Sequence, residues 1–124
     1  MRTFRTMRVE GVIAQELSAF IKRDVDLPLG TLVTINSVSV SSKKMELAKV
    51  MVSVLPDDKA DEVMEILNRF RGQLQHALNH KMNIQPMPRI VFVYDKGPEH
   101  AARIEKIMIE EKKKEEGKEN GAAL

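Results

Sequence analysis

Two runs rich in β-branched residues, separated by a short polar segment, constrain the fold of this chain most strongly. Leu32–Val40 is dense in valine, isoleucine and threonine, residues that pack well on a pleated surface. Residues 48–55 alternate strictly, with valine at every second position, which is the period at which side chains alternate between the faces of a strand. Because residues 41–46 between them are few and polar, we expect a β-hairpin with one buried face.

A long amphipathic helix is expected on either side of this hairpin. Apolar residues recur at intervals of three and four within residues 8–22 and again within residues 59–81. This spacing places each set along one side of a helix. Pro28 and Gly30 end the first helix, because proline excludes the helical conformation from the residue before it and glycine accepts positive φ.

The second of these helices is expected to bend. Asp57 and Asp58 supply an N-cap candidate and place carboxylates at the positive end of the helix dipole. Gly72 lies in the helix interior, where glycine costs about 1 kcal/mol relative to alanine. We therefore expect a kink, with two helical arms meeting near Gly72.

The last part of the chain predicts one more strand and one more helix. Residues 90–94 form a short apolar run preceded by prolines, which suit the entry of a strand rather than its middle. A right-handed crossover through the preceding helix would make this strand parallel to residues 48–55. Residues 98–108 have a helical apolar side, and residues 110–124 are charged and expected to be disordered.

These elements predict an α+β fold in the order α-β-β-α-β-α, with the helices on one face of a small mixed sheet of three strands. At 124 residues the chain has room for one hydrophobic core. We expect a single domain over residues 1–109, followed by the charged tail.

Composition excludes several classes of function. The chain contains no cysteine, so it has no disulfide, no thiolate zinc site and no cysteine nucleophile. No window approaches the roughly 18 apolar residues of a membrane span, and residues 1–7 lack the apolar run of a secretory signal. We expect a cytoplasmic protein with no membrane contact.

Catalysis is not expected either. His76 and His80 are four residues apart, a spacing that can bind a metal, but no third ligand at a matching position is evident. No nucleophile or phosphate-binding loop of recognisable spacing is present. The sequence predicts neither an enzyme nor a need for a metal, a cofactor or a small-molecule substrate.

Charge is segregated along the chain rather than mixed. The net charge is only +2, from 20 basic and 18 acidic residues, yet residues 67–94 contain no aspartate or glutamate. A local excess of cations draws a polyanion to one face of a small domain. The cations of this segment are Arg69, Arg71, Lys81 and Arg89.

A second basic group stands near the N-terminus. Arg2, Arg5 and Arg8 recur every three residues, so a helix would align them on one side, whereas an unstructured arm could wrap along RNA. Ordinary solvated charge is the alternative interpretation of either group. The chain has no tryptophan and one tyrosine, so binding should depend on shape and phosphates more than on base identity.

Five segments, in the same order, resemble the ribosome-binding factor A family. They are Arg8-Val9, Leu-Pro-Leu-Gly at 27–30, Val-Thr-Ile at 33–35 with Val-Ser-Val-Ser at 38–41, Ala-Lys-Val-Met-Val-Ser-Val-Leu at 48–55, and Pro-Arg-Ile-Val-Phe-Val-Tyr-Asp at 88–95. The resemblance covers about residues 7–108. It implies a type II KH-like fold and a bacterial factor that binds the small (30S) ribosomal subunit late in assembly, assists maturation of 16S rRNA, and catalyses nothing.

The same resemblance bears on the helix bend. The family replaces the KH nucleic-acid loop by a helix kink of Ala-x-Gly type, and the matching positions are Phe70, Arg71 and Gly72. Gly72 agrees with the pattern and Phe70 departs from it. Gln75 stands where the family commonly has a basic residue.

The sequence therefore predicts a monomer that binds the small ribosomal subunit and its rRNA through a basic helical face. Arg71 is the leading single residue, because it adjoins Gly72, where backbone can approach RNA closely. Two alternatives remain: a generic KH-like RNA-binding module, or an adaptor that binds proteins through its sheet edges or its tail. The predicted RNA-binding residues are Arg5, Arg8, Arg69, Arg71, Gly72, Lys81 and Arg89.

Overall fold

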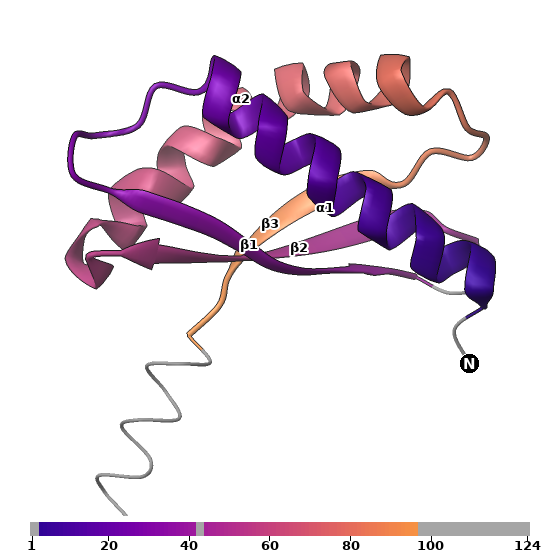
Figure 1. Cartoon of the computed structure of the whole chain (residues 1–124), viewed down its shortest axis with the longest axis horizontal. Coiled ribbons are helices and arrows are strands. Elements are labelled where there is room, and N and C mark those ends of the chain that lie inside the picture. The colour runs from indigo at the N-terminus through magenta and orange to yellow at the C-terminus, as the bar shows by residue number, and fades with distance from the viewer. Residues whose placement is uncertain (1–2, 42–43, 97–124) are drawn as a thin grey trace, which may run out of the picture.

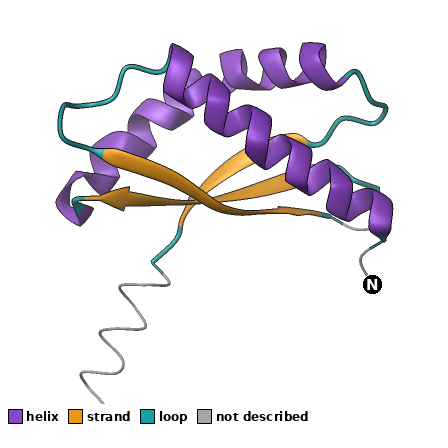
Figure 2. Ribbon diagram, viewed as in Figure 1, coloured by secondary structure: helices purple, strands orange, loops and turns teal. Residues whose placement is uncertain are grey.

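Two helices cover one face of a three-stranded sheet (Figures 1 and 2). The computed structural model describes residues 3–41 and 44–96. The predicted helix over residues 98–108 and the predicted tail lie outside this range. The elements are α1 (Phe4–Asp24), β1 (Leu32–Val40), β2 (Leu47–Leu55), the short 3₁₀ helix η1 (Asp57–Lys59), α2 (Ala60–Met82) and β3 (Arg89–Tyr94).

The sheet has the predicted topology. Its strand order is β1-β2-β3, with β1 antiparallel to β2 and β2 parallel to β3. The valines at alternate positions of the central strand β2 are buried. They pack beneath fully buried residues of both helices, among them Ile13, Leu17, Leu67 and Leu78. The α+β architecture and the buried face of the hairpin are confirmed.

A β-bulge at Asn36 keeps the apolar side chains of strand β1 on the core side of the sheet. The register with β2 shifts between Ile35 and Ser37, so one extra residue is accommodated on β1. Before the bulge Ile35 packs against the core, and after it Val38 and Val40 are buried. Without the extra residue these two valines would have pointed to the opposite face.

Helix α1 begins one turn earlier than the predicted start at residue 8. Thr3 is its N-cap, and the Thr3 side chain accepts a hydrogen bond of 3.1 Å from the backbone N–H of Thr6. A capped start stabilises the first turn. Arg5 and Arg8 are therefore carried by a helix and not by an unstructured arm, whereas Arg2 lies outside the described residues.

The start of helix α2 differs from the prediction. Lys59 occupies the N-cap position and makes no side-chain capping bond, and Asp57 and Asp58 belong to the preceding 3₁₀ helix. The expected aspartate cap was wrong, because the 3₁₀ turn moves both carboxylates away from the helix entry. Asp61 and Glu62 lie in the first turn of α2, where they favourably oppose the helix dipole.

Helix α2 bends without being interrupted. In Figure 1 its first and second halves run in different directions, and the helical structure continues from Ala60 to Met82 through Gly72. A Cβ atom placed on Gly72 would meet no other atom within 4 Å. No contact inside the described part of the protein therefore requires a glycine at this position.

A buried carboxylate ties α1 to the edge of the sheet. Glu10 is 5% exposed, and its Oε2 accepts a hydrogen bond of 2.8 Å from the backbone N–H of Val40. Glu10→Ala is expected to lower the free energy of unfolding by about 1.5–3 kcal/mol, because a buried N–H loses a charged acceptor. Urea unfolding measures this loss. Gln15→Ala, at an exposed position of the same helix, is the control, and equal stability of the two variants would contradict the assignment.

Candidate nucleic-acid interface

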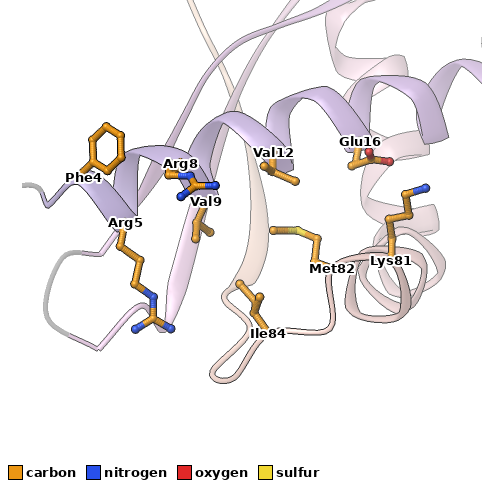
Figure 3. Close-up of a pocket in the computed structure, with 9 residues that line it drawn as sticks. All are labelled: Phe4, Arg5, Arg8, Val9, Val12, Glu16, Lys81, Met82 and Ile84. Carbon is orange, nitrogen blue, oxygen red and sulfur yellow. The ribbon is translucent and has the colours of Figure 1, made fainter.

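A groove of about 500 Å³ lies between the N-terminal half of α1 and the end of α2. Figure 3 shows its residues, with Met82 reaching toward Val12 and with Arg5 and Ile84 on the same side of α1. Its apolar lining is Phe4, Val9, Val12, Met82 and Ile84. Its charged lining is Arg5, Arg8, Lys81 and Glu16.

Helical spacing and one left-handed residue build this groove. Arg5, Val9, Val12 and Glu16 recur at intervals of three and four, so they lie along one side of α1. Asn83 ends α2 in the left-handed conformation, with φ 49° and ψ 50°, as is common after helix C-termini. The chain turns there, so that Met82, the last residue of the helix, and Ile84, in the loop after it, both line the groove.

The cations of the groove form no ion pair with any described residue and can therefore bind a ligand. Within residues 3–41 and 44–96, neither Arg5, Arg8 nor Lys81 has a carboxylate within 4 Å. The first turn of α1 carries no acidic residue, so the positive end of its dipole adds to the same field. Among the residues that the structure describes, Glu16 is the one acidic residue that lines the groove. The electrostatic character of this end of the protein is positive.

The remaining predicted cations are dispersed. Arg69 forms an ion pair of 3.3 Å with Glu65, one turn earlier on α2. Residues two apart differ by about 200° around a helix, so Arg69 and Arg71 point to nearly opposite sides. Arg71 is exposed and, among the described residues, unpaired. Arg89 is exposed beside the fully buried Ile90, so strand alternation places it on the sheet face away from the helices.

The structure thus places Lys81 along the same groove as Arg5 and Arg8, which stand far earlier in the sequence, and separates the four cations of residues 67–94. Sequence reasoning missed the apolar lining of the groove. The sequence did contain a signal for it. Phe4, Arg8 and Val12 follow one another at intervals of four, which places two apolar side chains and a cation along one side of a helix. Phe4 is 76% and Val12 43% exposed, and neither is part of the core.

Arg23 lines a separate hollow together with Lys81, but its guanidinium already has partners. Its guanidinium donates two hydrogen bonds, of 2.8 and 2.9 Å, to the Asp24 carboxylate, and it stacks over Phe20 at 5.1 Å. These hydrogen bonds raise the pKa of Arg23 and lower the pKa of Asp24. We therefore leave Arg23 out of the candidate interface.

Gln75 has a structural role that the sequence did not reveal. Its Nε2 donates to the carbonyl of Pro88 at 3.1 Å, and its Oε1 accepts from the N–H of Ile90 at 2.7 Å. One side-chain amide thus links α2 to the entry of β3. Position 75, where the family resemblance led us to expect a basic residue, is therefore occupied by a side chain that pairs with backbone groups.

The described residues hold neither a recognisable metal site nor a membrane span. Within residues 3–41 and 44–96, no three histidines or carboxylates converge to hold a metal ion. No helix of this part of the chain combines the length and apolar character needed to cross a membrane.

Comparison with known proteins identifies the family. A family model described as ribosome-binding factor A matches residues 5–108. Ribosome-binding factor A of Ectopseudomonas mendocina is 34% identical over 123 residues, covering 93% of this chain and 95% of the relative. The Pseudomonas paraeruginosa protein of the same name is 35% identical over 116 residues, covering 88% and 90%.

Solved structures agree with the fold. An NMR structure of a candidate ribosome-binding factor A from Thermotoga maritima superposes with a TM-score of 0.64 at 29% identity, covering 76% of this chain and 90% of that one. The crystal structure of ribosome-binding factor A from Thermus thermophilus gives 0.62 at 22% identity, covering 72% and 94%. These likenesses support the KH-like fold, and the family is one of non-enzymatic assembly factors. The chain belongs to the ribosome-binding factor A family.

Proposed function

We propose that this protein binds the small (30S) ribosomal subunit in the cytoplasm, as a monomer, and assists late assembly and 16S rRNA maturation. Family membership supports the partner. A model of the Thermus thermophilus relative, 20% identical with a TM-score of 0.52, has been fitted into a cryo-EM map of a 30S complex.

The observation that carries the proposal is that three cations, which form no ion pair with any described residue, line one groove of the helical layer. Arg5, Arg8 and Lys81 line one groove, and phosphate contacts of this kind supply most of the sequence-independent affinity for nucleic acid. Arg71 adds an exposed cation on α2 that has no ion-pair partner in residues 3–41 and 44–96. The RNA-facing surface is therefore the helical layer, and its centre is the groove rather than the middle of α2.

Cosedimentation tests the proposal. Wild-type protein at moderate salt is expected to comigrate with purified small subunits and not with large subunits. An excess of a short single-stranded RNA should displace little of it. Folded protein that fails to comigrate would contradict the proposal, and efficient displacement by the short RNA would favour a general RNA-binding module.

Gly72→Ala is expected to raise stability and to weaken subunit binding. Gly72 and Gly11 are both exposed inside helices, and a Cβ at either would meet no atom within 4 Å. Alanine at either position is therefore expected to raise the free energy of unfolding by about 0.5–1 kcal/mol. Gly72→Ala should in addition weaken subunit binding, by several-fold, because its methyl group stands beside Arg71, where we place the RNA backbone. Unchanged binding by both variants would remove Gly72 from the interface.

A further inference from the structure

The groove combines two chemistries that a phosphate-binding surface alone does not need. Its cations suit phosphates, but Val12 and Phe4 expose large apolar surfaces beside them. Exposed apolar clusters rimmed by polar groups mark binding sites. A ligand for this groove should therefore carry both an anionic and a flat apolar part.

We infer that the groove between α1 and α2 receives one unpaired nucleotide of the bound rRNA, its base on the apolar floor and its flanking phosphates at Arg5, Arg8 and Lys81. This inference rests on the proposed function and specifies which form of RNA its basic surface recognises. It gives the apolar lining of the groove a role in binding the base, a role that the charge pattern did not explain.

Charge and size together select this occupant. Of the described residues, three cations and one carboxylate line the groove, and the first turn of helix α1 beside it has no acid. This charge favours a polyanion over a peptide of mixed charge. A volume of about 500 Å³ lies within the range of roughly 300–1,000 Å³ typical of small-ligand sites, and so is on the scale of one nucleotide.

An RNA duplex cannot contact both the cations and the apolar side chains of the groove. In A-form RNA the bases are stacked inside the helix, and the accessible surface consists of phosphates and 2′-hydroxyls. A duplex could meet the cations but would leave Val12 and Met82 uncovered. An unpaired nucleotide offers its base face to these side chains, so the single aromatic ring among the described residues of the groove, Phe4, is supplemented by aliphatic side chains and a thioether.

The salt dependence of two variants tests the inference with purified small subunits as the probe. Val12→Gln is expected to lose about tenfold in affinity at every salt concentration, as for loss of one base contact, with no change in the slope of log K against log salt. Arg8→Gln is expected to reduce that slope by about 0.7–0.9, because one phosphate contact disappears. Leu55→Gln, at a position 59% exposed on the sheet, should bind as wild type does.

A second measurement observes the groove directly. The methyl NMR signals of Val12, Met82 and Ile84 in the full chain are expected to shift with a ten-nucleotide single-stranded RNA and much less with a duplex of the same length. Phe4→Gln, at a position 76% exposed, provides a second variant that removes apolar lining without touching the core. It too should weaken subunit binding.

The outcomes are distinct. Val12→Gln and Phe4→Gln that bind as wild type does, or methyl signals that shift equally with the duplex, would overturn the inference and leave the proposed function standing. Val12→Gln that weakens binding to intact subunits but not to protein-free small-subunit rRNA would assign the groove to a protein segment, which also overturns it. Wild-type protein that ignores subunits but shows the single-strand methyl shifts would support the nucleotide site while contradicting the ribosomal function.

Discussion

The double variant Arg8→Glu with Lys81→Glu is expected to lose at least about a hundredfold in affinity for small subunits at moderate salt. Both side chains line the groove and have no carboxylate within 4 Å among the described residues. Reversal replaces two phosphate attractions by two repulsions at the end of the molecule where the helix dipole of α1 is also positive. Cosedimentation with small subunits across a salt series measures the loss.

The matched control is Lys22→Glu with Lys49→Glu, which makes the same change in net charge at exposed positions that do not line the groove. It should lower affinity only through long-range electrostatics, and therefore much less at 0.15 M salt, where the Debye length is about 8 Å. Equal losses in both double variants would show that net charge, and not the groove, governs binding.

Gln75→Leu is expected to lower the free energy of unfolding by about 2–4 kcal/mol. The substitution removes the acceptor of the Ile90 N–H and the donor to the Pro88 carbonyl, and both residues are buried. Each buried backbone group left without a partner costs on the order of 1–3 kcal/mol. Urea unfolding followed by circular dichroism gives the value.

Gln73→Leu, an exposed position on the same helix, is the control for the change in helix propensity and surface polarity. It should alter stability by less than about 0.5 kcal/mol. If Gln75→Leu were no less stable than Gln73→Leu, the amide would not hold β3 against α2 as the structure indicates.

The fold could be predicted well where local patterns decide it. The valine alternation of β2 specified the buried face of the hairpin, and the crossover rule gave the parallel pairing of β2 and β3. The errors lie at helix ends, where single hydrogen bonds decide. Thr3 caps α1 one turn before the predicted start, and the 3₁₀ turn at Asp57–Lys59 displaced the expected aspartate cap.

The site could be predicted only in part, because proximity in sequence is not proximity in space. Arg69 and Arg71 are neighbours along the chain but point to opposite sides of α2, and Arg69 pairs with Glu65. Lys81 lines the same groove as Arg5 and Arg8 only because the end of α2 packs beside α1. That packing depends on tertiary contacts of the core, which charge patterns along the chain do not report.

The central claim is that the groove end of the helical layer faces rRNA, and site-specific photo-crosslinking in the complex with small subunits tests it most directly. A photoreactive phenylalanine analogue would replace Phe4, at the groove, or Leu55, on the sheet; both are more than half exposed. We predict crosslinks to 16S rRNA from position 4 and none from position 55. Crosslinks to rRNA from position 55 with none from position 4 would contradict the account.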